Sequence, residues 1–119
     1  MSRILFCEDD PTIHKLIRVA MRNSEHEVSM AINGAEGLKL AREIRPTVIF
    51  TDASMPDMDG FQLVDAVRAD PDLSATPIVF ITASVQRADV EEALRRGASR
   101  VIGKPFTVSQ LHEVVAEFS

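Results

Sequence analysis

Polar side chains that could serve phosphoryl transfer follow four short apolar segments of the chain. The segments and the residues after them are 4–7 with Glu8, Asp9 and Asp10; 47–50 with Asp52; 78–81 with Thr82; and 101–103 with Lys104 and Pro105. If the segments are parallel strands of one sheet, these side chains meet at its carboxyl edge, where such sheets bind ligands. Acids, a hydroxyl and an amine in one place predict a metal-dependent phosphoryl site.

The acids favour magnesium over zinc as the metal. Carboxylates as close as those expected for Asp9 and Asp52 raise each other's pKa values unless a cation lies between them. Mg²⁺ prefers one or two carboxylates together with waters and a phosphate, whereas zinc would need histidine or cysteine ligands. Glu8 and Asp9 leave the strand directly, while Asp10 followed by Pro11 is typical of a helix N-cap.

Thr82 and Lys104 each have a structural interpretation as well as a functional one. Thr82 could hydrogen-bond a phosphoryl oxygen, or it could close a strand and cap the following turn. Lys104 could place a point charge on a phosphate, or it could be a solvated surface lysine. The Lys104–Pro105 bond can be cis, which would direct the lysine side chain inward.

Size and composition narrow the class of protein. The 119 residues fit one domain spanning 1–119, and 45% apolar residues are enough for a core. A net charge of −5 argues against direct nucleic-acid binding, which usually needs a basic face. The single cysteine, Cys7, cannot form an intramolecular disulfide, and its apolar neighbours predict a buried position. Since neither a signal peptide nor a membrane span is evident, we expect a cytoplasmic protein without membrane contact.

Apolar periodicity alternates between strand and helix along the chain. Strands are predicted at 4–7, 28–32, 47–50, 78–81 and 101–102, and helices carry apolar stripes at 13–21, 38–44, 61–67, 90–94 and 111–118. Residues 27–32 alternate in polarity, which is typical of an edge strand, whereas 47–50 is apolar on both faces. Thr107 and Gln110 have the spacing of a capping box. The alternation predicts a doubly wound α/β sheet with helices on both faces.

The motifs match a known family in order and spacing. They are Glu8-Asp9, Asp52 with Met55-Pro56-x-Met58-Asp59-Gly60, Thr82-Ala83, and Lys104-Pro105-Phe106. Over essentially its whole length the chain resembles the receiver domains of bacterial two-component response regulators, the CheY-like proteins. The resemblance implies a flavodoxin-like fold with five strands in the order 2-1-3-4-5, in which the second strand lies at an edge.

The resemblance also implies a phosphoacceptor and a set of metal ligands. Asp52 would accept a phosphoryl group from a phosphohistidine of a histidine kinase or a histidine phosphotransfer protein. Asp9 would bind Mg²⁺ directly and Glu8 through a water molecule, while Asp52 and the backbone carbonyl of Ser54 would complete the protein ligands.

Lys104 and Thr82 would respond to the phosphoryl group. Lys104 and the metal would neutralise its charge, and Thr82 would move toward it and shift the balance between inactive and active states. The fourth helix, fifth strand and fifth helix would then contact a downstream protein. Such a module is not an enzyme beyond promoting its own phosphorylation and dephosphorylation.

Three positions bear on how phosphorylation would switch the domain and on how long the phosphoryl group would last. Many receivers carry tyrosine or phenylalanine three residues before the lysine, and that ring turns inward with the threonine. Here the position is Val101, which cannot make this change. Ser54 and Ser84 occupy positions that tune the lifetime of the phosphoryl group in the family, and neither supplies an acid or an amide.

A single-domain response regulator is not the one function that the sequence allows. A receiver domain cut from a longer regulator or from a hybrid histidine kinase would have the same features. A Mg²⁺-dependent phosphatase with an aspartyl nucleophile usually has a second aspartate two residues after the first, where this chain has Ser54. Retention of the acids, Thr82 and Lys104 argues against a receiver that is never phosphorylated.

Overall fold

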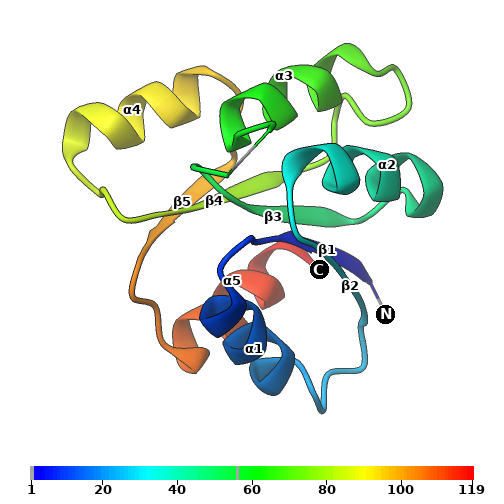
Figure 1. Cartoon of the computed structure of the whole chain (residues 1–119), viewed down its shortest axis with the longest axis vertical. Coiled ribbons are helices and arrows are strands. Elements are labelled where there is room, and N and C mark those ends of the chain that lie inside the picture. The colour runs from blue at the N-terminus through cyan, green and yellow to red at the C-terminus, as the bar shows by residue number, and fades with distance from the viewer. Residues whose placement is uncertain (1, 56) are drawn as a thin grey trace.

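The computed structural model of the chain describes residues 2–55 and 57–119. Met1 and Pro56 lie outside the described residues, and Pro56 is one position of the 55–60 motif. Within the described part, five strands alternate with five helices (Figure 1). The strands are β1 (Arg3–Cys7), β2 (Glu27–Ala31), β3 (Val48–Asp52), β4 (Ile78–Thr82) and β5 (Arg100–Gly103), and the helices are α1 (Pro11–Ala20), α2 (Gly34–Ile44), α3 (Gly60–Ala69), α4 (Arg87–Arg95) and α5 (Val108–Phe118).

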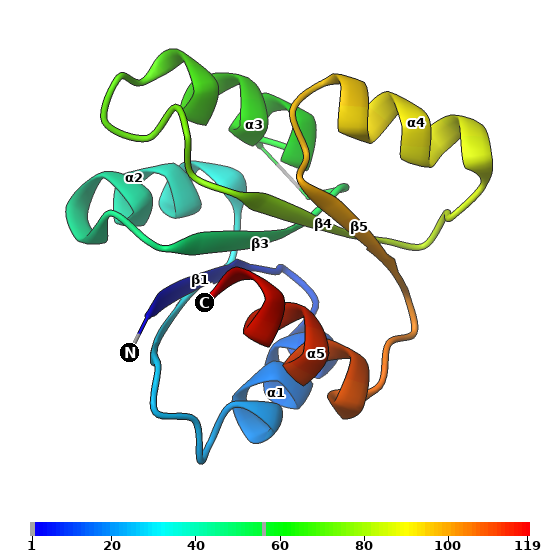
Figure 2. The same cartoon turned by 180° about the vertical axis from the view of Figure 1, so that it is seen from behind.

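The strands form one parallel sheet in the order β2-β1-β3-β4-β5, which confirms the predicted doubly wound, flavodoxin-like fold. β2 lies at an edge and is mostly half-buried, whereas every residue of β3 is buried. Helices α1 and α5 cover one face, and α2, α3 and α4 cover the other (Figure 1 and Figure 2). Asp52 is the last residue of β3, as predicted, so the acid belongs to the sheet itself.

An apolar core lies on each face of the sheet because successive side chains of a strand point to opposite sides. Ile4 and Phe6 of β1 pack with α1 and α5, whereas Leu5 and Cys7 pack with α2 and α3. The rings of Phe6 and Phe50 stack with their centroids 4.8 Å apart. The two central strands are therefore anchored on both sides, which fixes the ends from which the acids project.

Side-chain caps set the beginnings of several helices. Asp10 accepts a 2.8 Å hydrogen bond from the amide two residues later, which confirms the predicted N-cap of α1. Thr107 and Gln110 exchange bonds of 3.0 and 2.8 Å at the start of α5, which confirms the predicted capping box. A second capping box, between Asp59 and Gln62, begins α3 and was not predicted.

Arg68 joins three segments near one end of the fold. Its guanidinium donates hydrogen bonds to the carbonyls of Ser74, Thr76 and Gly97 at 3.0, 2.7 and 2.8 Å. Gly97 follows α4 with a φ of +120°, as expected for a glycine after a helix. The arginine therefore ties α3 to the segment before β4 and to the turn before β5.

Helix α4 is attached mainly through small and polar contacts. Ala93 is its buried residue, and its N-cap residue, Gln86, makes no side-chain capping bond. Beyond its last turn, the guanidinium carbon of Arg96 lies 4.3 Å from the ring centroid of Phe61 on α3. This helix therefore buries little apolar surface of its own.

Each helix in the described part of the chain is too short or too polar to cross a lipid bilayer.

Candidate functional site

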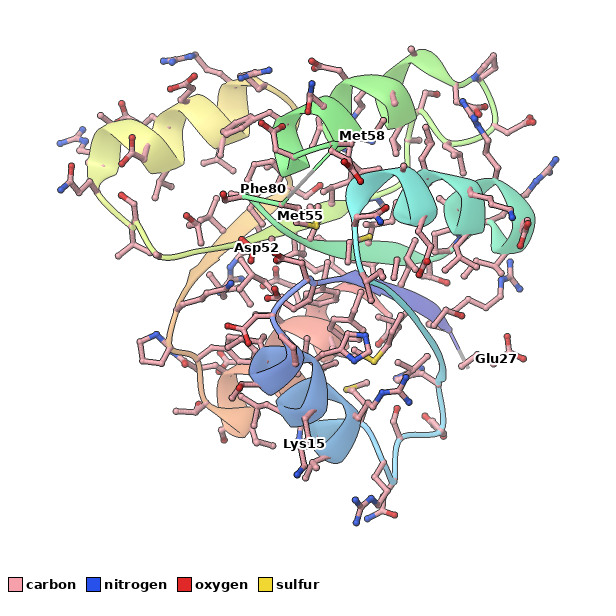
Figure 3. All side chains as sticks on the ribbon, viewed as in Figure 1. Lys15, Glu27, Asp52, Met55, Met58 and Phe80 are labelled. Atoms are coloured by element: carbon pink, nitrogen blue, oxygen red, sulfur yellow. The ribbon has the colours of Figure 1, made fainter. Side chains whose placement is uncertain are left out.

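Three carboxylates meet at the carboxyl ends of β1 and β3. Glu8 and Asp9 follow β1. Asp52, labelled in Figure 3, ends the neighbouring β3. One oxygen from each residue lies within 4.8 Å of the other two. The structure therefore brings together the acids that the sequence placed at one sheet edge, as the topology of parallel strands requires.

Asp52 is buried and held from two sides. Its Oδ1 accepts a 3.1 Å hydrogen bond from the amide of Ser54, and its Oδ2 lies 2.5 Å from Nζ of Lys104. The backbone behind it is closely packed, because a Cβ at Gly60 would lie 2.7 Å from the Asp52 carbonyl oxygen. Gly60 therefore allows the start of α3 to fit against the end of β3.

Glu8 is buried while the next residue, Asp9, is exposed. Its Oε2 accepts a 3.0 Å hydrogen bond from the Asp10 amide. Its Oε1 lies 3.1 Å from Nζ of Lys104 as an ion pair, yet it has no partner in hydrogen-bond geometry among residues 2–55 and 57–119. Burial raises the pKa of Glu8 to about 7, with a further increase from Asp52, against the lowering effects of the Asp10 amide and Lys104.

Lys104 reaches the acids from the end of β5. Burial alone would lower its pKa, but Asp52 and Glu8 together outweigh this effect and raise it. The backbone amide of Lys104 donates to the Thr82 carbonyl at 2.8 Å, and the Lys104–Pro105 peptide is cis. Of the two interpretations of Lys104, the ion pairs exclude a solvated surface lysine.

The residues present fit a hard divalent cation. When ionised, Glu8, Asp9 and Asp52 carry three negative charges against the one positive charge of Lys104, which leaves an excess of two. Apart from its ion pair with Lys104, the buried Oε1 of Glu8 also has no hydrogen-bond partner within the described part of the chain. Oxygen donors with excess negative charge are the ligands that Mg²⁺ selects. The role of the Ser54 carbonyl as a ligand stays a prediction.

Thr82 ends β4 beside β3, where Asp52 pairs in register with Ile81. Its hydroxyl oxygen accepts a 3.2 Å hydrogen bond from the amide of Ser84. In this structure Thr82 therefore caps the following turn, which is the structural interpretation of the residue.

Two features near Thr82 were not predicted from the sequence. The hydroxyl of Ser84 donates a 2.5 Å hydrogen bond to Asp89 in the first turn of α4. A cavity of about 160 Å³ also lies beside Thr82, with Phe80 and Val101 in its lining. The small side chain at position 101 is the one feature of the sequence that could have indicated this cavity.

A larger cavity, of about 650 Å³, lies at the opposite end of α1 from the acids. Its lining includes Met21, His112 and Val115. Because Asp10 caps the first turn of α1 and this cavity borders the last, it is separate from the carboxylate cluster.

Comparisons with known proteins agree with the geometry. The sequence profile of the response regulator receiver domain matches residues 4–116. The protein PilH of Pseudomonas aeruginosa is 34% identical over 105 residues, which cover 88% of this chain and 87% of PilH. Of several other curated relatives, DNA-binding response regulators among them, the chain spans about half the length, 46% in one case and 47% in another.

Solved structures show the same fold. The chemotaxis response regulator CheY4 of Vibrio cholerae is 29% identical, with a TM-score of 0.93 over 100% of this chain and 99% of that one. The receiver domain of a sensor histidine kinase from Pseudomonas aeruginosa, with a magnesium ion coordinated in its active-site cleft, is 26% identical, with a TM-score of 0.89 over 98% of this chain and 96% of that one. The chain therefore belongs to the response regulator receiver domains, the phosphorylation-dependent signalling modules of two-component systems.

Proposed function

We propose that Asp52 is the phosphoacceptor of this receiver domain. The observation that carries the proposal is a buried carboxylate at a strand end, 2.5 Å from the ammonium of Lys104 and clustered with Glu8 and Asp9. A carboxylate oxygen of Asp52 attacks phosphorus as the bond from phosphorus to the donor's imidazole nitrogen breaks. The products are an acyl phosphate on Asp52 and a free imidazole on the donor.

Mg²⁺ is the proposed metal. Asp9, Asp52 and the Ser54 carbonyl would bind it directly and Glu8 through water. The Oε1 of Glu8, which has no hydrogen-bond partner among the residues that the structure describes, supports this assignment, and so does the magnesium ion in the related kinase receiver domain. When bound, the ion would neutralise charge on the transferring phosphoryl group.

Side chains of the protein would supply the other contacts to the phosphoryl group. Lys104, already paired with Asp52, would follow the negative charge onto a phosphoryl oxygen. Thr82 would exchange its bond from the Ser84 amide for one to the phosphoryl group. This exchange would shift the segment before α4 and bias the domain toward its active state.

The proposed partners follow from this chemistry. The donor is a histidine kinase or a histidine phosphotransfer protein in the cytoplasm, and the output surface comprises α4, β5 and α5. Residues 1–119 act as one receiver domain, as a single-domain regulator or as part of a longer protein. The domain acts on protein partners without direct nucleic-acid or membrane contact, and it catalyses only reactions of its own phosphoryl group.

Phosphorylation by acetyl phosphate tests the acceptor. With Mg²⁺ present, we expect one acid-labile and base-labile adduct, located at Asp52 by reductive trapping and peptide mass spectrometry. Asp52→Asn should remove the adduct, whereas Asp57→Asn, which changes an exposed aspartate of the same loop, should retain it. A wild-type protein that never took up the group under these conditions would falsify the assignment.

A further inference from the structure

The cavity beside Thr82 is large enough for one aromatic ring. Its volume is about 160 Å³, and its walls include Phe61, Phe80, Ala93 and Val101. The rings of Phe61 and Phe80 meet edge to face with centroids 5.0 Å apart, so two of the walls support each other. An apolar protein cavity of about 150 Å³ is known to bind benzene.

Val101 leaves this space open. It is half-buried on β5 and lies directly opposite Phe80 in the register of β4 and β5, so both side chains point to the same face of the sheet. A valine at this position does not extend across the space toward α4. The cavity therefore exists because none of the side chains that the structure describes fills it.

The charged side chains that line the cavity indicate which kind of ligand could fill the cavity. The two charged residues that line the cavity are both acids of α4, Asp89 and Glu92, and both are exposed. Asp89 accepts a hydrogen bond from the Ser84 hydroxyl, while Glu92 lies 3.9 Å from Arg96 as an ion pair. A ring that is followed by a cation would therefore complement both the walls and the mouth of the cavity.

We propose that this cavity, hereafter the ring slot, docks an aromatic side chain of a partner protein in which lysine or arginine adjoins the aromatic residue. The ring would lie against Phe61, Phe80 and Val101, and the cation would face the carboxylates of α4. The partner would thus supply in trans the ring that position 101 lacks.

Docking should also respond to phosphorylation, and this part rests on the proposed function. Thr82 lines the ring slot, and in this state its hydroxyl accepts the bond from Ser84. When the hydroxyl turns to a phosphoryl group on Asp52, that wall recedes and the slot widens. A partner ring would then bind the phosphorylated form more tightly and, by linkage, stabilise it.

Nuclear magnetic resonance of the full chain tests the ring slot with short blocked peptides. The probe is Gly-Lys-Tyr-Lys-Gly, and its matched controls replace tyrosine with alanine or both lysines with glutamate. We expect saturable shifts of the Ala93 and Val101 methyl signals with the probe at roughly millimolar concentration, as a single buried ring allows. Each control peptide should bind at least about tenfold more weakly.

Variants separate the ring slot from other surfaces. Val101→Phe fills the slot from within and should weaken probe binding at least about tenfold, the scale of a lost hydrophobic contact. Val19→Phe makes the same change at an exposed valine of α1, outside both the slot and the proposed output surface, and should bind like the wild type. Ala93→Val, which narrows the slot from α4, provides a second test if the first variant does not fold.

The outcomes distinguish this inference from the proposed function. Probe binding is measured first without Mg²⁺ or phosphoryl donor, and then with Mg²⁺ and beryllofluoride, where binding should tighten several-fold. Equal binding of the tyrosine and alanine peptides, or unchanged binding by Val101→Phe, would overturn the ring slot. Tyramine that bound as tightly as the peptide would assign the slot to a free small molecule and overturn partner docking. If the probe binds but Asp52 takes up no phosphoryl group, the slot stands and the proposed function fails.

Discussion

The ammonium nitrogen of Lys104 lies 2.5 Å from Oδ2 of Asp52, although the two residues are 52 positions apart in the sequence. The same nitrogen lies 3.1 Å from Glu8. In this state the lysine supplies the positive charge that the two buried acids require. Any metal that enters the cluster must therefore bind next to a cation.

We predict that Lys104→Met separates metal binding from phosphotransfer. Removal of the ammonium leaves more negative charge on Glu8 and Asp52, so Mg²⁺ should bind roughly fivefold more tightly. Loss of the charge that stabilises the phosphoryl oxygens should slow labelling by acetyl phosphate about 10- to 100-fold. Calorimetry and labelling rates measure the two effects, and Lys39→Met, at an exposed lysine of α2, is the control. Weaker Mg²⁺ binding by Lys104→Met would contradict this account.

The pKa of Glu8 predicts how the stability of the metal-free protein depends on pH. Folding raises this pKa from 4.5 to about 7, mainly through burial. Between these values the folded state binds more protons than the unfolded state, so stability decreases as pH rises through this window. We expect a loss of roughly 1–3 kcal/mol of unfolding free energy from pH 5 to pH 8 that can be assigned to Glu8.

Urea unfolding with a chelator measures this effect at both pH values. Glu8→Gln has no proton to lose, so its unfolding free energy should change much less across the same range. At pH 8 the variant should be the more stable protein when metal is absent. Parallel pH profiles for the two proteins would show that Glu8 does not titrate as described.

Gly37 and Cys7 make a packing contact that a single methyl group should disturb. A Cβ at position 37 would lie 2.4 Å from the sulfur of Cys7, which is buried. Alanine normally stabilises a helix interior relative to glycine by roughly 0.5–1 kcal/mol. Here the overlap should reverse the sign, and we expect Gly37→Ala to cost about 1–3 kcal/mol.

A double-mutant cycle isolates the contact. In a Cys7→Ala background the added methyl group has room, so Gly37→Ala should become neutral or stabilising there. The coupling energy from urea unfolding should be at least about 1 kcal/mol. Thiol labelling gives an independent check, since burial raises the pKa of Cys7 to about 12 and the native protein should react slowly. An additive cycle would exclude the overlap as the cause.

Arg68 should matter more to stability than surface arginines that form ion pairs. Arg68→Met removes donors to the carbonyls of Ser74, Thr76 and Gly97, and we expect a loss of about 2–3 kcal/mol. The matched control, Arg87→Met, breaks an exposed pair with Glu91 and should cost at most about 0.5 kcal/mol. Equal losses in chemical denaturation would mean that the three carbonyls find other donors.

The positions of the acids could be predicted because each follows an apolar segment that reads as a buried strand. Parallel strands then bring Asp9 and Asp52 to one edge without further information. The different burial of Glu8 and Asp9 could not be predicted in this way. Adjacent acids look alike in a sequence, and the direction in which the chain leaves β1 decides which one is enclosed.

The helix cap at Asp59 and the cavity beside Thr82 could not be predicted from the sequence. The capping role of Asp59 depends on where α3 begins, which the residue types around Gly60 do not show by themselves. Val101 indicated that a ring was missing, but the cavity also depends on Phe61 and Ala93, which come from other helices. Volumes of this kind arise only when separate elements are packed together.

Asp52 lies on a strand that is buried throughout, whereas α4, which closes the ring slot, has a single buried residue, an alanine. Substitutions on the exposed surface of α4 can therefore alter the shape and charge offered to a partner while the end of β3 keeps its place. If such a chain were duplicated, the copies could come to bind different partner proteins. The phosphorylation reaction itself could stay the same in all of them. Specificity of the output would then evolve faster than the reaction that controls it.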